Sequence, residues 1–263
     1  MSPMCSIRIS KRFIRVWQRN LTVYQKIWKV VLLPPILEPI FYLLAFGAGL
    51  SVLVGAIHYH GSDVSYVRFI APALIAINMM QNAFFENTYA SFVRMYYQKT
   101  FDAMMATPLS LEEIMTGEII WGATKSVIAT AIMQGVISLF GLVQYPQGFL
   151  IIPLAFLAGI AFGSIGLFFT GMVRTIEMFN LPIFLFITPM FVFSGTFFPL
   201  ENLPLWAQRL AIFFPLTHLV KLTRSFSLGL MSTDLLWGLA YLLLFSLLFF
   251  PLAILRMRRR LIK

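Results

Sequence analysis

Residues 126–173 read SVIATAIMQGVISLFGLVQYPQGFLIIPLAFLAGIAFGSIGLFFTGMV, and this stretch contains no charged residue. A helix needs roughly 20 mostly apolar residues to cross a bilayer, so the stretch is about twice the length of one span. It is interrupted once, at residues 144–148, where a proline and a glycine lie in a turn-promoting cluster. The stretch therefore predicts two consecutive membrane-spanning helices joined by a short turn.

Further apolar intervals extend this pattern toward both ends of the chain. The predicted spans cover about residues 34–57, 69–93, 119–143, 149–173, 178–198 and 235–255. The apolar stretch Leu210 to Val220 is too short to cross and contains Pro215, which predicts a re-entrant segment between the fifth and sixth spans. We expect residues 1–263 to form a single all-α integral membrane domain with six transmembrane helices.

The composition excludes an ordinary soluble enzyme. Hydrophobic residues make up 59% of the 263 residues and charged residues only 11%, against about a quarter in soluble domains. The formal net charge is +10. Because the basic residues lie at the ends and in the connections of apolar runs, we expect membrane lipid headgroups, and not nucleic acid, to be their partner.

Basic residues also set the expected orientation. Seven lysine or arginine residues and no acidic residue precede the first span, and five follow the last span without an acid. An excess of these residues marks the cytoplasmic side, and an even number of spans places both termini on one side. We therefore expect the N-terminus, the C-terminus and residues 94–118 in the cytoplasm.

Residues 7–30 predict an amphipathic helix in the membrane interface. A helix turns by about 100° per residue, and on this basis the basic residues fall within an arc of about 100° around the helix axis. Large apolar side chains lie on the opposite face, namely Phe13, Trp17, Leu21, Tyr24 and Trp28. Such a helix places its aromatic face in the acyl boundary. It serves either as an anchor that only sets orientation or as a connecting helix beside a cytoplasmic partner, and periodicity does not separate the two.

The predicted cytoplasmic loop contains a second short helix. Residues 98–108 read as a helix that Pro108 terminates, and Ser110 to Glu113 have the spacing of a capping box that opens the next helix. A solvated turn is the alternative, but it rarely needs several large apolar residues together. We therefore expect Phe101, Met104 and Met105 to be exposed to a partner.

Three blocks of sequence carry a resemblance to a known family. They comprise residues 97–104 (YQKTFDAM) with Leu109 and 117–125 (GEIIWGATK), residues 188–204 (TPMFVFSGTFFPLENLP), and residues 214–218 (FPLTH) with Arg224 and Gly229. Together they resemble the membrane subunits of type-2 ABC exporters, and within that family the permeases of nodulation-factor (lipo-chitooligosaccharide) exporters. The resemblance covers essentially the whole chain.

The resemblance implies a multi-pass permease of a bacterial inner membrane. It implies a partnership with a second permease copy, expected to form a homodimer, and with a separately encoded cytoplasmic ABC ATPase that binds ATP and Mg²⁺. The exported molecule would be an amphiphile such as a lipo-oligosaccharide or a polysaccharide, with drug or antibiotic efflux as the alternative. The chain lacks a G-x-x-x-x-G-K-[ST] loop, so we expect it to bind no cofactor itself.

The resemblance also identifies the loop helix as the coupling helix that contacts the ATPase. The expected coupling residues are Gln98, Lys99, Thr100, Phe101, Asp102, Met105 and Pro108. Lys99 and Asp102 would make the polar contacts, and Phe101 and Met105 the packing contacts.

Polar residues within the predicted spans suggest a translocation path. A glutamate at the bilayer centre costs about 2.5–3.5 kcal/mol, and two glutamates lie in otherwise apolar spans. The expected path residues are Glu38, Asn78, Asn82, Glu86 and Phe191. The alternative is structural: each glutamate pairs with a nearby arginine or amide, the asparagines bond between helices, and the phenylalanine faces lipid.

Two other function classes fit the sequence less well. An intramembrane enzyme would use Ser164 or Ser194 with His218, yet neither serine lies in G-x-S-x-G. His58 and His60 have only Asp63 nearby, whereas three protein ligands are usual for a catalytic metal. A membrane scaffold does not explain the apolar loop helix. We therefore expect neither catalytic residues nor a metal site.

Overall fold

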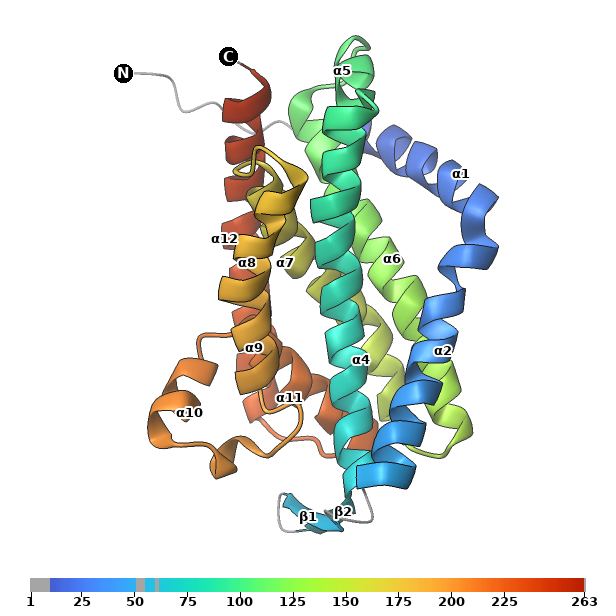
Figure 1. The fold of residues 1–263 in the computed structure, drawn as a ribbon, viewed down its shortest axis with the longest axis vertical. Coiled ribbons are helices and arrows are strands. Elements are labelled where there is room, and N and C mark those ends of the chain that lie inside the picture. The colour runs from blue at the N-terminus through green and yellow to red at the C-terminus, as the bar shows by residue number, and fades with distance from the viewer. Residues whose placement is uncertain (1–9, 51–54, 60–61, 263) are drawn as a thin grey trace.

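Long helices that run along one another form the body of the protein (Figure 1). The computed structural model describes residues 10–50, 55–59 and 62–262. The α-helices are α1 (Phe13–Val31), α2 (Leu33–Tyr42), α4 (Tyr66–Phe85), α5 (Thr100–Met105), α6 (Leu111–Leu139), α7 (Ile151–Thr170), α8 (Asn180–Pro182), α9 (Thr188–Phe193), α10 (Leu205–Ala211), α11 (Pro215–Leu228) and α12 (Asp234–Leu261).

Short turns of π- or 3-10 helix extend or join these helices. They are η1 (Leu43–Leu50), η2 (Glu86–Ala90), η3 (Val93–Tyr97), η4 (Gln147–Leu150), η5 (Ile176–Phe179), η6 (Ile183–Ile187) and η7 (Leu200–Asn202). Strands β1 (Ala56–Tyr59) and β2 (Ser62–Ser65) pair in antiparallel fashion, with Ile57 opposite Val64. The fold is thus helical apart from this hairpin in the part of the chain that the structure describes.

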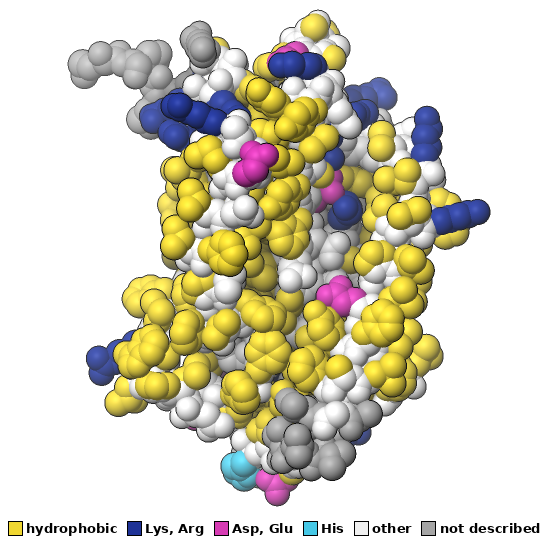
Figure 2. Space-filling model, in the orientation of Figure 1, with side chains coloured by type: hydrophobic (Ala, Val, Ile, Leu, Met, Phe, Trp, Pro, Cys, Tyr) yellow, Lys and Arg dark blue, Asp and Glu magenta, His cyan; other side chains and the backbone are white. Residues whose placement is uncertain are grey.

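The two ends of the bundle carry different connections. α5, the start of α1 and the last turns of α12 lie at one end, which we call the α5 end (Figure 1). The β1–β2 hairpin, α10 and α11 lie at the other, which we call the hairpin end. Most lysine and arginine side chains on the face shown in Figure 2 lie toward the α5 end.

Four helices are long and apolar enough to cross a membrane. They are α6, η4 with α7 (Gln147–Thr170), the run from η5 to α9 (Ile176–Phe193), and α12. Helix α1 and residues Leu33–Gly47 are bent by 40° relative to each other and make a fifth only if the pair is one span. The described residues therefore contain four or five candidate spans by this measure, against the six expected from the sequence.

The predicted span at residues 69–93 begins with α4, which is not among these candidates. This helix runs the length of the bundle, but it carries Arg68, Asn78, Gln81 and Asn82 among its apolar residues (Figure 1). Most of α4 is buried against α6, α7 and α11. Because protein and not lipid surrounds α4, its sequence needs less overall hydropathy than that of a lipid-exposed helix.

Several helices begin or end a few residues away from the limits of the predicted spans. The third helix begins at Leu111 and not at 119, because Ser110 Oγ accepts from the amide of Glu113 at 3.2 Å while the Glu113 carboxylate accepts from the Ser110 amide at 2.9 Å. The first helix ends by Leu50 and not at 57, since Ala56 already begins β1, and residues 51–54 lie outside the described residues.

The last two predicted spans end elsewhere as well. Helix α9 ends at Phe193 instead of 198, because Gly195 adopts a positive φ of 69° that a helix does not tolerate. Helix α12 continues to Leu261 instead of 255 and carries its terminal arginines as extra helical turns.

The predicted short segment between the fifth and sixth spans forms two helices. α10 exposes Leu205 and Trp206, whereas α11 is largely buried against α4 and α12. The Arg224 side chain on α11 is buried and donates to the carbonyl oxygens of Phe69 at 3.1 Å and Gly195 at 3.0 Å. This arginine ties α11 to α4 and to the turn after α9, while re-entrance into a membrane remains a prediction.

Helices α6 and α7 pack at backbone distance. A Cβ atom placed on Gly159 of α7 would lie 2.5 Å from the Cα of Ala123 on α6. Gly163, one turn along, similarly faces Asn87, whose Nδ2 would be 2.9 Å from an added Cβ. These glycines allow the close helix approach that a G-x-x-x-G spacing favours.

Replacement of Gly159 by alanine should therefore weaken the fold. We expect G159A to lower the free energy of unfolding by about 1–3 kcal/mol, since the added methyl group forces two backbones apart. Gly135, also on α6, has open space around it, so G135A is the matched control and should be neutral or slightly stabilising. Thermal unfolding in detergent measures both, and equal midpoints for the two variants would contradict the packing argument.

Candidate functional site

Helix α1 lies directly on α6. A Cβ atom on Gly117 would lie 2.6 Å from the Cβ of Val16, and Trp17 Nε1 donates to Thr124 Oγ1 at 3.0 Å. The rings of Tyr24 and Trp121 meet edge to face at 5.6 Å. Trp17 and Tyr24, which the periodicity assigns to the acyl boundary, are half-buried against α6, while Trp28 on the same face is 48% exposed.

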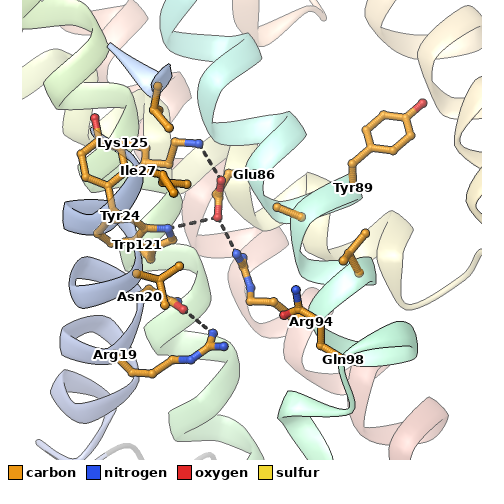
Figure 3. A pocket seen from close by; sticks show the side chains of 14 residues that line it. Arg19, Asn20, Tyr24, Ile27, Glu86, Tyr89, Arg94, Gln98, Trp121 and Lys125 are labelled. Atoms are coloured by element: carbon orange, nitrogen blue, oxygen red, sulfur yellow. Dashed lines mark hydrogen bonds and ion pairs between the residues drawn. The ribbon is translucent and has the colours of Figure 1, made fainter. Parts of the chain in front are cut away.

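A chain of ion pairs lies beneath α1. The carboxylate of Glu86 on η2 accepts from Lys125 Nζ at 2.7 Å, from Trp121 Nε1 at 3.0 Å and from Arg94 Nη1 at 2.8 Å (Figure 3). Arg94 thus links Glu86 to a second acidic residue in this series of ion pairs.

Glu118 on α6 is that second acid. Its Oε2 accepts from Arg94 Nη2 at 2.6 Å and from Ser91 Oγ at 2.7 Å, and its Oε1 accepts from Asn20 Nδ2 on α1 at 2.8 Å. Arg19 completes the chain by donating to Asn20 Oδ1 at 2.8 Å. The network, defined as Arg19, Asn20, Glu86, Arg94, Glu118 and Lys125, joins α1, η2, η3 and α6.

The network sets three cations against two acids in a shielded position. Glu118 is fully buried, and the side chains of Glu86, Arg94 and Lys125 are 6%, 12% and 21% exposed. Each acid contacts at least one cation, which offsets much of the large desolvation cost of burying it. Glu86 contacts two cations, whereas Glu118 pairs only with Arg94, so loss of Arg94 removes the ion pair of the fully buried acid.

A cavity of about 460 Å³ opens between α1 and the η2–η3 segment. One wall carries Glu86, Arg94 and Lys125 of the network, and the α1 side contributes apolar residues such as Val23 and Ile27. Figure 3 shows the three charged side chains converging between α1 and α4. Arg19 also lines the cavity from α1, and Ala90 and Val93 line it from the η2–η3 side, so charged and apolar side chains are mixed around it.

Four of the five predicted path residues lie along one line. Asn78, Asn82 and Glu86 follow at intervals of four residues, which places them on one face of α4 and η2. Asn82 Nδ2 donates to the Asn78 carbonyl at 3.0 Å, and Asn78 Nδ2 lies 3.5 Å from Glu38 Oε2 on α2. Figure 2 shows charged side chains in a hollow between apolar ridges on this face.

Phe191 lies apart from this line. Its ring is 5.1 Å from that of Phe197, and Phe197 in turn lies 6.1 Å from Phe46, in an aromatic group near the hairpin end. The structure thus brings Glu38, Asn78, Asn82 and Glu86 together and leaves Phe191 outside. The alternative interpretation of Glu86 as the partner of a nearby arginine agrees with its contact to Arg94.

The predicted loop helix exists, but its apolar residue has a different role. The Phe101 side chain of α5 is fully buried, so the expectation that it is exposed to a partner is wrong. It belongs to a cluster with Phe92, Met95, Leu111 and Ile114. A helix of six residues is not stable alone, and Phe101 supplies the tertiary contact that holds it.

The exposed surface of this loop is polar and aromatic. Gln98, Lys99, Asp102 and Pro108 are exposed, whereas Thr100, Met104 and Met105 are half-buried. Tyr96 and Tyr97 add exposed aromatic side chains, and Lys99 Nζ lies 5.5 Å from the Tyr96 ring. We call Tyr96, Tyr97, Gln98, Lys99 and Asp102 the loop surface. The predicted coupling residues leave out both tyrosines, although Tyr97 lies in the sequence block that carries the family resemblance.

The geometry does not assemble a serine–histidine pair. Ser194 Oγ accepts from Thr217 Oγ1 at 3.1 Å, and His218 Nε2 lies 2.9 Å from the Ile212 carbonyl with its ring stacked on Tyr241. His58 Nδ1 lies 3.1 Å from Asp63 Oδ1, while His60 lies outside the described residues. No cluster of three or more metal-binding side chains occurs in residues 10–50, 55–59 and 62–262.

Comparison with known proteins identifies relatives over almost the full chain. A family profile described as "ABC-2 type transporter" matches residues 11–228. The chain is 36% identical to "Nodulation protein J" of Rhizobium leguminosarum bv. trifolii, over 97% of this chain and 95% of that protein. It is 33% identical to "Nodulation protein J" of R. leguminosarum bv. viciae, over 95% of both chains. Identity to "Inner membrane transport permease YadH" of Escherichia coli K12 is 24%, over 89% of this chain and 90% of that protein.

Proposed function

Because the chain belongs to the ABC-2 type transporter family, we propose that it is the membrane-spanning permease of an ATP-driven exporter. A second permease copy and a separate cytoplasmic ABC ATPase complete the transporter, and the ATPase binds ATP and Mg²⁺. The permease crosses the inner membrane of a bacterium six times. One of these spans is α4, whose polar residues lower its overall hydropathy. The α5 end faces the cytoplasm, which agrees with the excess of basic side chains there.

The main support for this proposal is the position of α5 between η3 and α6, two segments that carry charged residues of the network. It joins η3, which carries Arg94, to α6, which carries Glu118 and Lys125. Phe101 fixes α5 to the cluster beneath it. A force applied to the loop surface by an ATPase would therefore act on the two segments whose charges meet under α1. The loop surface is the coupling surface in this proposal.

The cavity supports an amphiphilic substrate. Its charged side chains suit a polar headgroup, and the apolar side chains among them suit the start of an acyl chain. The line from Glu86 through Asn82 and Asn78 to Glu38 offers polar contacts along α4 toward the middle of the bundle. A lipo-oligosaccharide or polysaccharide is the proposed substrate class, as the resemblance of the sequence to permeases of nodulation-factor exporters implies.

A co-purification experiment tests the coupling surface. We expect the tagged wild-type permease to retain an ABC ATPase from native membranes. The variant K99A/D102A should retain at least about tenfold less, since each exposed contact contributes on the order of 1 kcal/mol or more. These two side chains are exposed, so the permease itself should fold normally.

The matched control replaces one lysine and one acid at the hairpin end. Lys221 and Glu201 are exposed there, and K221A/E201A should retain the ATPase fully. Undiminished ATPase recovery with K99A/D102A would refute the assignment of the loop surface. Absence of any ATPase from the wild-type preparation would refute the exporter itself.

A further inference from the structure

A second, smaller cavity lies between the end of α7 and the last turns of α12. Its volume is about 240 Å³, and it lies at the α5 end because α12 ends there. The lining residues are Gly171, Met172, Val173, Arg174, Arg256, Arg259 and Arg260. The lining thus contains four arginines and no acidic side chain.

None of the four arginines forms an ion pair with an acidic side chain in the described residues. Arg174 and Arg259 are exposed and form no ion pair within the described part of the chain, and the buried Nε atom of Arg256 has no hydrogen-bond partner there. Arg260 differs, because it donates to the Thr170 carbonyl and lies over the Phe92 ring at 5.5 Å. The cavity therefore concentrates positive charge that the protein does not neutralise.

Close packing fixes the inner edge of this cavity. A Cβ atom on Gly171 would lie 2.9 Å from Arg256 Cγ and 3.3 Å from the Met257 amide nitrogen. The glycine lets the end of α7 touch α12 and holds the stem of Arg256 in place. The guanidinium groups are thus presented by two packed helix ends and not by a free tail.

An apolar column on α12 leads away from the cavity. Leu244, Leu248, Leu252 and Leu255 are 68%, 55%, 37% and 43% exposed. At about 100° per residue they fall within an arc of about 80°, and Arg259 falls within the same arc. An exposed arginine therefore follows an exposed column of leucines on one face of one helix.

We propose that this cavity binds the phosphate headgroup of an anionic phospholipid, whose acyl chain lies along the leucine column of α12. Guanidinium groups bind phosphate oxygens through paired hydrogen bonds, and basic pockets between helices near the cytoplasmic side attract anionic lipids. The arginines of the cavity lie next to the leucine column, and a lipid would contact both. An acidic protein surface would match only the arginines, so the arrangement favours a lipid. The site is separate from the charged cavity under α1 and does not depend on the ATPase.

Lipid retention measured by native mass spectrometry tests the proposal. The purified permease is exposed to phosphatidylglycerol or phosphatidylcholine in detergent, and bound lipid is counted. Wild type should retain phosphatidylglycerol in preference to phosphatidylcholine. The variant R174Q/R256Q/R259Q should lose roughly a hundredfold in apparent affinity, at about fivefold for each arginine.

The control removes the same charge elsewhere on the α5 side of the chain. Arg15, Lys26 and Lys29 are exposed on α1, so R15Q/K26Q/K29Q should retain phosphatidylglycerol like wild type. The single variant R259Q changes only an exposed side chain, so it keeps the fold intact and should lose about fivefold. Unchanged retention in the triple or single variant would overturn the proposal. Equal losses of phosphatidylglycerol in the triple variant and the control would overturn it too. The same holds if the triple variant binds lipid like wild type but no longer retains the ATPase.

Discussion

Replacement of Arg94 by glutamine should lower the free energy of unfolding by about 3–5 kcal/mol. Arg94 donates to both Glu86 and Glu118, and Glu118 is fully buried. Without the guanidinium group, Glu118 keeps only neutral partners, the hydroxyl of Ser91 and the amide of Asn20. Glu86 is less affected because Lys125 still contacts it. The cost is therefore that of one buried and unpaired carboxylate.

Denaturant unfolding in detergent measures this loss, and a second variant locates its cause. R94Q/E118Q removes both partners of the fully buried pair and should recover a large part of the stability that R94Q loses. Lys29 is exposed and makes no ion pair within the described residues, so K29Q should match wild type. If R94Q/E118Q were no more stable than R94Q, the loss would come from packing or from Glu86 and not from an unpaired Glu118.

The sequence predicted the local features of this region well. The Ser110–Glu113 capping box, the short helix before it and the family itself are confirmed. Each depends on residues close together in the chain, where hydrogen-bond geometry and helix periodicity act directly. The resemblance added the residues that flank the loop.

The long-range contacts were harder to predict. Arg94 and Glu118 lie at the two ends of the predicted cytoplasmic loop, 24 positions apart in the sequence, yet their side chains bond at 2.6 Å. Only the return of α6 alongside η2 and η3 brings them together. A usable signal was the spacing of Glu86 and Arg94, eight residues apart and therefore on one helical face.

The exposure of side chains was the second property that was difficult to predict from the sequence. Hydrophobic residues in a loop suggest a partner surface, and this reasoning placed Phe101 outside when it is fully buried. The same reasoning assigned the aromatic face of α1 to lipid, although Trp17 donates to Thr124 and Tyr24 packs on Trp121 of α6. Periodicity shows which residues share a face, but it does not show whether lipid, a partner or another helix of the same chain covers that face.

Replacement of Phe101 by alanine should release α5 from the bundle. A buried phenylalanine truncated to alanine typically costs about 3–5 kcal/mol, and here the lost contacts are those that hold a helix of six residues. Amides of residues 100–107 should then exchange with solvent faster by a factor of at least about a hundred. Hydrogen–deuterium exchange followed by mass spectrometry measures this, with D102A as the exposed control that should leave exchange unchanged.

The same pair of variants separates anchoring from contact. Under the proposed function, D102A weakens ATPase recovery while α5 stays protected, because Asp102 contacts only the partner. F101A weakens recovery and protection together, because the surface that the ATPase contacts loses its fixed position. F101L preserves most of the buried volume and should restore both readouts to a large extent. Rapid exchange in F101A with full ATPase recovery would mean that a fixed α5 is not required for coupling, and the ATPase contact would then lie elsewhere on the α5 end.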